Sequence, residues 1–349
     1  MKNNEINSVE IAKRAGVSRS TVSRVINNYP NVPPETREKV MKVIQQYNYF
    51  PNVSAQVLAG KITKTIGLFL IEKGEVASDV LTNTLVVSVI ENASAAGYYV
   101  LTNIIRNTQD EEAVKGVKEI FYQRRINGGV FIGAANHEPL IEELIQDGFV
   151  VAVVDQELKE KSESNRIIVN FDNDLGMQQA VDYLVSLNHR KIGVINGDML
   201  RQSGPSKYEG YLKAMKQHGL SIRPEWVLPG DFNEHSGYQA AKALMEQGGD
   251  KPTAIIAAND SVAFGAMKAF KEKGIQIPED ISVIGFDDHP ISSMYHPALT
   301  TIKVDFKEMM SELTSALIRH IEQGIDECQA FRIGCSLVIR DSCRAIQPK

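Results

Sequence analysis

Apolar residues recur at helical spacing in three short stretches near the start of the chain. In the stretch GVSRSTVSRVI, Val22, Val25 and Ile26 stand at i, i+3 and i+4, which places them on one side of a helix. Ser18 precedes this helix, and its hydroxyl can cap the free N–H groups. A third apolar stripe lies further on, at Val40, Val43, Ile44 and Tyr47. The pattern predicts three short helices.

The stretch NSVEIAKRAG predicts how the first of these helices begins and ends. Asn7 is expected to be its cap, with Glu10 three residues later completing a capping box. Gly16 is expected to end the helix in the left-handed conformation and to turn the chain sharply. The first two helices are therefore joined by a tight glycine turn.

From Thr65 onward, short β-branched runs alternate with helical stretches, and successive runs lie roughly 20–35 residues apart. The first series of expected strands is TIGLFL, YYVLTN, GGVFIG, FVVAVVD and RIIVNFD. The second series is KIGVING, WVLPGD, AIIAAND, SVIGFDD and LTTIKVD. This alternation is typical of βαβ units. Two series predict two doubly wound, parallel-sheet subdomains side by side.

Charge separates the two parts of the chain. The 349 residues carry a net charge of -5, but the segment through Lys64 carries +6 and the remainder -11. A small basic head on an acidic body indicates a module that binds a polyanion. The alternative is a solvated basic tail, but such tails lack the apolar periodicity seen here.

Several classes of protein are disfavoured. The longest apolar run is about seven residues and the start lacks an apolar signal, so we expect a cytoplasmic protein without a membrane partner. The three cysteines, Cys328, Cys335 and Cys343, show no pairing or metal-ligand pattern. No G-x-G-x-x-G turn follows a strand, and the histidines are scattered. We expect no cofactor, no metal and no enzymatic activity.

The second expected helix carries polar side chains opposite its apolar stripe. Ser20, Ser23, Arg24 and Asn27 share that face, and no carboxylate lies among them. A helix fits the major groove of DNA, where arginine can donate two hydrogen bonds to guanine. The arrangement favours a helix-turn-helix that binds DNA. The alternative is a three-helix domain with an ordinary soluble face.

A further segment, YFPNVSAQVLAGK, predicts a helix of about two turns from Asn52 to Leu58. A helix this short is not stable alone, because nucleation is not recovered within so few residues. The segment is either a linker or a helix that orders only against DNA and an identical partner segment.

These stretches together resemble the LacI/GalR transcriptional regulators. VEIAKRAGVSRSTVSRVIN, TREKV, YNYFPN and AQVLAGK stand in the order and spacing of that family. The resemblance implies DNA contacts at Ser18, Arg19, Ser20, Thr21, Ser23, Arg24, Asn27 and Asn31. It also implies a hinge helix whose Val57, Leu58 and Ala59 contact the minor groove, with Leu58 as a wedge that kinks the duplex. Pro33 replaces the serine cap usual before TREKV, and the third helix should tolerate it.

The later motifs PTAIIAANDSVAFGAMKAF, DISVIGFDD and LTTIKVDF resemble the effector domain of the same family, which is similar to periplasmic sugar-binding proteins. Several expected strands end in polar residues, where open parallel sheets bind ligands. The resemblance implies an effector site at Asp155, Phe171, Lys207, Phe232, Asn259, Asp287 and Phe306. Core packing is the alternative for the phenylalanines.

Two positions depart from the family pattern. Lys207 stands where relatives commonly have arginine, and Ile71 where several sugar-binding relatives have a polar residue. Lysine is a single mobile charge, whereas arginine offers a planar fork. We therefore expect a small polar effector: a sugar, or an acidic or phosphorylated sugar that Lys207 neutralises.

The predicted organisation has three parts: residues 1–50 for DNA binding, 51–62 for the hinge, and 63–349 for effector binding and dimerisation. Within the last part, one subdomain takes about 63–165 and 303–331, and the other about 166–302 and 332–345. The resemblance implies a homodimer on a pseudopalindromic operator, most simply a repressor of a carbohydrate-utilisation operon that its effector controls allosterically. The alternatives are a sugar-binding protein without a DNA role, an activator, or a corepressor-dependent repressor.

Overall fold

The computed structural model of the chain describes residues 6–50, 62–72, 74, 76, 80–157, 159 and 161–347. The chain divides into two compact units, Met1–Thr63 and Lys64–Lys349, called here the N-terminal and C-terminal units. The predicted hinge residues Val57, Leu58 and Ala59 lie outside the described residues.

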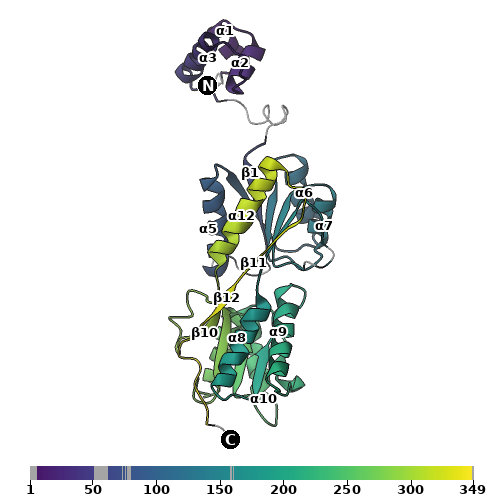
Figure 1. Cartoon of the computed structure of the whole chain (residues 1–349), viewed down its shortest axis with the longest axis vertical. Coiled ribbons are helices and arrows are strands. Elements are labelled where there is room, and N and C mark those ends of the chain that lie inside the picture. Colours follow the sequence, from purple (N-terminus) through teal and green to yellow (C-terminus); the bar gives the residue numbers. More distant parts are fainter. Residues whose placement is uncertain are drawn as a thin grey trace. The chain divides into compact units, whose positions relative to one another are not determined.

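The N-terminal unit contains the three predicted helices (Figure 1). They are α1 Ser8–Ala15, α2 Arg19–Ile26 and α3 Pro34–Gln46. Their apolar stripes meet in one small core, which contains Ile11, Ala12, Ala15, Val22, Val25, Val32 and Val40. The helical periodicity of the sequence therefore placed the inward faces correctly.

The ends of α1 and α2 show why these helices begin and stop where they do. The Asn7 side chain accepts hydrogen bonds from the backbone N–H groups of Val9 and Glu10, and Gly16 ends α1 at a φ of 65°. Ser18 accepts one from Thr21 N at 3.1 Å. The capping box is not formed, because the Glu10 carboxylate accepts a hydrogen bond from Arg14 Nε instead, at 2.9 Å.

Two features of α3 concern how the helix starts and how it is held against the end of α2. The helix starts at Pro34 with Pro33 at the cap position and no side-chain cap, so the expectation that it tolerates proline is confirmed. Arg37 on α3 donates to Asn28 Oδ1 at 2.7 Å and to Tyr29 O at 2.6 Å. The guanidinium thus joins α3 to the turn that follows α2, a role that the sequence did not reveal.

The C-terminal unit is built on two six-stranded sheets. The first has the order β11-β5-β4-β3-β1-β2, and all of its neighbours are parallel. Its strands are β1 Thr65–Ile71, β2 Tyr99–Ile105, β3 Gly129–Ile132, β4 Val151–Val154, β5 Arg166–Phe171 and β11 Gln329–Ile333. This sheet and the helices packed on it form the first lobe.

The second sheet has the order β12-β10-β9-β8-β6-β7. Its strands are β6 Ile192–Ile195, β7 Val227–Leu228, β8 Ala254–Ala257, β9 Ser282–Asp287, β10 Thr300–Val304 and β12 Cys335–Val338. Only the last pair, β10 with β12, is antiparallel among the strand pairs described. The predicted doubly wound class is confirmed, with this one antiparallel edge added.

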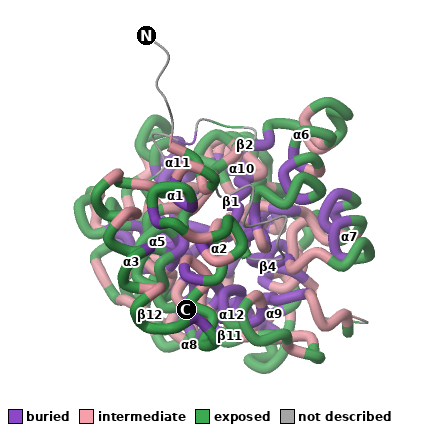
Figure 2. Tube along the Cα trace, turned by 90° about the horizontal axis from the view of Figure 1, so that it is seen from above, coloured by how far each residue is buried: buried purple, intermediate pink, exposed green. Residues whose placement is uncertain are grey.

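Helices cover both sheets (Figure 1). The first lobe has α5 Val80–Ala95, α6 Glu111–Tyr122, α7 Pro139–Gln146 and α12 Phe306–Gln323. The second lobe has α8 Asn173–Ser186, α9 Ser203–Gln217, α10 Glu234–Glu246 and α11 Asp260–Glu272, with a short 3₁₀ turn at Pro224–Trp226. In Figure 2, α7 is buried on one side and exposed on the other, as its apolar Leu140, Ile141, Leu144 and Ile145 require.

The chain passes between the lobes three times: after β5, between β10 and α12, and between β11 and β12. The predicted boundary at 165/166 is therefore wrong by one strand, because β5 pairs with β4 and β11 in the first lobe. All six residues of β5 are buried, so its sequence has no alternation that could assign it to one sheet or the other. The second lobe begins with α8.

A buried histidine makes the stability of the C-terminal unit depend on pH. His189 lies at the second sheet, with Nδ1 2.8 Å from Thr253 Oγ1 and Nε2 3.1 Å from Arg344 O. The carbonyl requires a donor at Nε2, so the neutral ring satisfies both contacts. Burial lowers the pKa of His189 below its usual value.

We expect the free energy of unfolding to fall as the pH drops below about 6.5, by up to about 1.4 kcal/mol per pH unit. The unfolded state then binds a proton that the folded state resists until its own lower pKa is reached. Urea titrations between pH 7.5 and 5 should show that the free energy of unfolding of His189→Gln depends less steeply on pH than that of wild type, although this variant is less stable at pH 7.5. His235→Gln, which changes an exposed histidine, should keep the wild-type pH dependence of the free energy of unfolding. The same pH dependence in all three proteins would refute the assignment of this effect to His189.

Candidate functional site

The exposed face of α2 is polar and free of carboxylates. Val22 and Val25 point into the core, and the positions between them face solvent. The eight positions predicted to contact DNA in this unit are exposed or half-buried: Ser18, Arg19, Ser20, Thr21, Ser23, Arg24, Asn27 and Asn31. No Asp or Glu occurs from residue 16 to residue 34. This face suits a polyanion.

The polar side chains of α2 are partly held by one another. Ser18 Oγ lies 2.7 Å from Ser20 Oγ and 2.8 Å from Thr21 Oγ1. Arg19 Nε donates to Ser8 Oγ on α1 at 3.1 Å. Arg24 makes no side-chain hydrogen bond or ion pair with the described residues, so its guanidinium is available for a ligand.

The seven predicted effector residues lie where the two lobes meet. From the first lobe, Asp155 follows β4, Phe171 ends β5 and Phe306 begins α12. From the second lobe come Lys207 on α9, Phe232 after β7, Asn259 after β8 and Asp287 at the end of β9. The carboxyl ends of the strands therefore bring these residues together, as the rule for open sheets predicts. We call this group the inter-lobe site; its role in ligand binding stays a prediction.

Lys207 lies at the centre of the inter-lobe site and is only 4% exposed. Its Nζ donates to Ala258 O at 2.6 Å and lies 4.0 Å from Asp287 Oδ1. The ring centre of Phe286, a residue that the sequence did not single out, lies 3.7 Å from Nζ. Burial lowers the pKa of Lys207, although Asp287 and Asp155 act in the opposite direction.

Asp155 connects the lobes through α9. Its Oδ2 accepts hydrogen bonds from Ser203 N at 3.1 Å and from Ser203 Oγ at 2.6 Å. Its Oδ1 is buried and accepts no hydrogen bond from the described part of the chain. Burial raises the pKa of Asp155, and the Ser203 hydrogen bonds oppose this. Ser203 was missed because it starts a helix one turn before Lys207 and carries no motif of its own.

Both polar atoms of the Asn259 side chain are hydrogen-bonded within the protein. Its Oδ1 accepts from Val262 N at 2.9 Å, which caps α11, and its Nδ2 donates to Phe232 O at 2.9 Å. Phe232 has a φ of 50°, and its ring lies where a Cβ on Gly197 would otherwise stand. The amide of Asn259 therefore positions Phe232 in the inter-lobe site.

Strained backbone gathers at this boundary. Asp155, Asp287 and Asp288 have φ values of 62°, 111° and 55°. Non-glycine residues adopt such angles only where the surroundings impose them, as is common at functional sites. The strain supports the inter-lobe site as the functional region of the C-terminal unit.

Asp260 holds the loop that carries this strain. Its carboxylate accepts hydrogen bonds from His289 N at 2.7 Å, Ser292 Oγ at 2.5 Å and Thr301 Oγ1 at 2.5 Å. Burial raises the pKa of Asp260 to about 6. The loop after β9 is thereby tied to the start of α11, which fixes the direction of Asp287.

A loop of the second lobe, residues 198–202, reaches the first lobe near the inter-lobe site. Asn136 N donates to Leu200 O at 2.8 Å, and Asn136 Nδ2 donates to Gln202 Oε1 at 3.2 Å. Arg201 lies 4.0 Å from Glu72. These contacts and Asp155–Ser203 link the lobes across loops, which is why no periodic signal could predict them.

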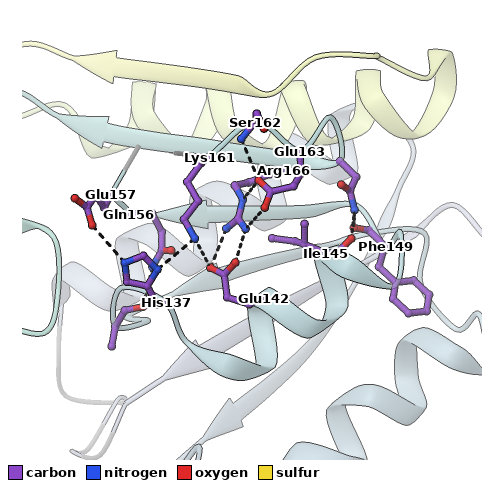
Figure 3. Close-up of polar contacts among 12 residues, drawn as sticks. His137, Glu142, Ile145, Phe149, Gln156, Glu157, Lys161, Ser162, Glu163 and Arg166 are labelled. Atoms are coloured by element: carbon purple, nitrogen blue, oxygen red, sulfur yellow. Dashed lines mark hydrogen bonds and ion pairs between the residues drawn. The ribbon is translucent and has the colours of Figure 1, made fainter. Parts of the chain in front are cut away.

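An ion-pair network stabilises the connection between β4 and β5, as Figure 3 shows. The fully buried Arg166 donates to both oxygens of Glu142 on α7, at 2.6 and 3.2 Å, and Lys161 Nζ lies 2.7 Å from Glu142 Oε1. Arg166 also binds Glu163 and lowers the pKa of that carboxyl to about 2. Arg166 pairs in register with Val151, so the network fixes the start of β5 to α7, at the end of the two strands away from Asp155.

Other kinds of site find no support in the described residues. Two surface hollows, of about 620 and 480 Å³, flank α10, and no predicted effector residue lines either. No group of three or more His, Cys, Asp or Glu side chains is placed to bind a metal ion in the described ranges. No helix among them is long and apolar enough to cross a membrane.

Comparison with known proteins agrees with both units. Residues 9–52 match the family model for bacterial regulatory proteins of the lacI family, and residues 181–343 match a periplasmic binding protein-like domain. The HTH-type transcriptional repressor PurR of Haemophilus influenzae (strain PittEE) is 32% identical over 341 residues, covering 97% of this chain and 98% of the relative. PurR of Pasteurella multocida (strain Pm70) is 32% identical over 337 residues, covering 96% and 98%.

Solved structures show the same fold. The lac repressor dimer bound to operator and the anti-inducer ONPF has a TM-score of 0.81 and 29% identity, covering 98% of this chain and all of that one. The complex of transcriptional regulator CelR with cellobiose has a TM-score of 0.75 and 26% identity, covering 97% and 99%. Since the similarity to the PurR repressors extends from the helix-turn-helix through both lobes, the chain belongs to the lacI family of DNA-binding bacterial regulatory proteins.

Proposed function

We propose that this regulator represses transcription by binding a pseudopalindromic operator as a homodimer, with a small polar effector at the inter-lobe site controlling its affinity. The observation that carries the proposal is the exposed, carboxylate-free face of α2, on a chain whose relatives over 97% of its length are named repressors. Arg24 and the α2 hydroxyls would read base edges and phosphates in the major groove.

A homodimer is supported by apolar surface on the first lobe. α5 packs against α12 with one side, while Val87 and Ile90 on another side are 50% and 38% exposed. On the edge strand β2, Tyr99 is 76% exposed. A helix that is apolar on opposite sides indicates a second contact surface, here a second copy of this lobe. Two copies would place two recognition helices on the two half-sites of an operator.

Control by effector would act through the contacts between the lobes. Asp155–Ser203 and Asn136–Leu200 join the lobes beside the predicted ligand residues, so an occupant that competes for these groups would change the inter-lobe angle. The proposed hinge, residues 51–62, would transmit this change by gaining or losing helical order on the operator. We propose induction, in which the effector weakens operator binding. A carbohydrate effector, and hence control of carbohydrate use, is supported by the likeness to the CelR–cellobiose complex.

The experiment is a selection of DNA from a random duplex library with the full-length protein. We expect enrichment of a pseudopalindromic sequence bound by two chains, with an affinity that falls steeply as salt increases. Sedimentation analysis of the complex gives the stoichiometry, and a scrambled duplex of equal length is the control. If the protein binds small molecules yet enriches no sequence and shows no salt-sensitive affinity, a ligand-binding protein without a DNA role is the correct alternative.

A further inference from the structure

The inter-lobe site holds an ammonium group in a cage of aromatic rings. The ring centres of Phe286, Phe171 and Phe232 lie 3.7, 5.2 and 5.5 Å from Lys207 Nζ. Phe171 comes from the first lobe, and the other two rings from the second. Aromatic faces attract cations, most strongly where water is excluded, and aromatic cages recognise ammonium ligands.

Among the residues that the structure describes, negative charge exceeds positive charge around this cage. Asp287 lies 4.0 Å from Lys207 Nζ, and Asp155 and Asp260 also act on the Lys207 charge. Arg201 is the other cation that acts on Asp155, and it is shared with Asp198 and Glu72. An anionic ligand would therefore enter a region that already carries surplus carboxylate. This argues against the acidic or phosphorylated sugar considered from the sequence.

One oxygen in the site has no partner among the described residues. Asp155 Oδ1 is buried while Oδ2 accepts two hydrogen bonds from Ser203. A buried carboxylate oxygen without a donor is costly, and a ligand that supplies a charged donor removes that cost. The unsatisfied oxygen therefore favours a ligand that donates hydrogen bonds there.

Lys207 has few polar contacts in the cage. Its Nζ has one short hydrogen bond, to Ala258 O, and a longer ion pair with Asp287. Its flexible stem carries a single charge, unlike the planar arginine of the family pattern, which would form a fixed fork. The Lys207 ammonium therefore resembles a small bound cation that is attached to the protein by a flexible side chain.

We infer that the cage of Phe171, Phe232 and Phe286, together with Asp155 and Asp287, is an ammonium-binding site, and that the effector is a small amine-bearing molecule that replaces the Lys207 ammonium. An amino sugar has the required charge and donors. This inference rests on the proposed function, because it names the chemical class of the effector for the same site.

The first test is chemical rescue of the full-length Lys207→Ala protein, followed by thermal unfolding. Millimolar butylammonium should raise the Tm of the variant by about 3 °C or more, and the matched probes butanol and butyrate by less than about 1 °C. Wild-type protein and Lys213→Ala, which loses only an exposed lysine paired with Asp174, should respond to none of the three. If Lys207→Ala does not fold without a ligand, recovery of folding with butylammonium but not with butanol or butyrate replaces the shift in Tm as the measurement. Equal rescue by butanol would show that an apolar void, and not a cation site, had been filled.

The second test uses wild-type protein and sets of matched ligands. Each set contains a hexose, its 2-amino derivative, its sugar acid and its 6-phosphate, and binding is measured by calorimetry. We expect binding within the amino-sugar class, and a loss of at least tenfold in affinity for Asp155→Asn. Binding confined to acids, phosphates or neutral sugars, or no binding of any amino sugar, would overturn the inference. Operator affinity without ligand is measured in parallel; its absence would contradict the proposed function and leave the ligand result standing.

Discussion

Gly265→Ala is expected to destabilise the C-terminal unit by about 3 kcal/mol or more in urea titrations. A Cβ at Gly265 on α11 would lie 1.9 Å from Glu234 O and 2.7 Å from Tyr238 N, both on α10. The approach is reciprocal, because a Cβ at Gly237 on α10 would lie 2.0 Å from Val262 O. The two helices are in backbone contact, so one methyl group must force them apart.

A matched control exists in the same unit. Gly116 lies inside α6, and a Cβ there would meet nothing within 4 Å. Gly116→Ala should therefore stabilise the protein by about 0.5–1 kcal/mol, because alanine loses less backbone entropy in a helix. If Gly265→Ala cost no more than about 1 kcal/mol, the backbone contact between α10 and α11 would be wrong.

The sequence predicted the local features of the N-terminal unit, because they depend on neighbours in the chain. Asn7, Gly16 and Ser18 act within four residues of the groups that they cap, and the stripe Val22–Val25 shows its period directly. Arg37 was missed because its partners, Asn28 and Tyr29, lie nine and eight residues away across a turn. Nothing in an amphipathic pattern reports such a contact.

In the C-terminal unit the strands could be found, but their sheets could not all be assigned. A strand such as β5, buried on both faces, looks the same in either lobe, and its partners β4 and β11 are separated by about half of the chain. The same limit hid the antiparallel β12, which returns beside β10 only after a helix and a strand in the first lobe.

The inter-lobe site could be anticipated in part, because the carboxyl ends of parallel strands converge. That rule and the family resemblance placed Asp155, Phe171 and Asp287 in one region. They did not identify Phe286, whose ring lies closer to Lys207 Nζ than those of Phe171 and Phe232. Phe286 precedes the polar end of β9, and its sequence context predicts an ordinary core residue. The charge balance also required the structure, since the sequence does not show how many carboxylates surround one lysine.

Arg24→Ala is expected to lower operator affinity by about 10- to 100-fold, measured by fluorescence anisotropy on the selected duplex. Arg24 is exposed on the polar face of α2 and makes no side-chain hydrogen bond or ion pair with the residues described. A guanidinium that bonds to both acceptors of a guanine contributes about 1–3 kcal/mol of discrimination, so its loss should also weaken the preference for the operator over a scrambled duplex.

Arg24→Lys separates base reading from simple charge. Lysine keeps the attraction to phosphate but lacks the planar fork, so the variant should retain the salt dependence of wild type while losing most of the preference for the operator. Lys115→Ala, which removes an exposed charge on α6 in the other unit, should change neither quantity. If lysine fully replaces Arg24, the residue contacts only the backbone of the duplex. Sequence reading must then depend on other predicted DNA contacts of α2, such as Arg19, Ser20 and Ser23, which the same assay can rank one at a time.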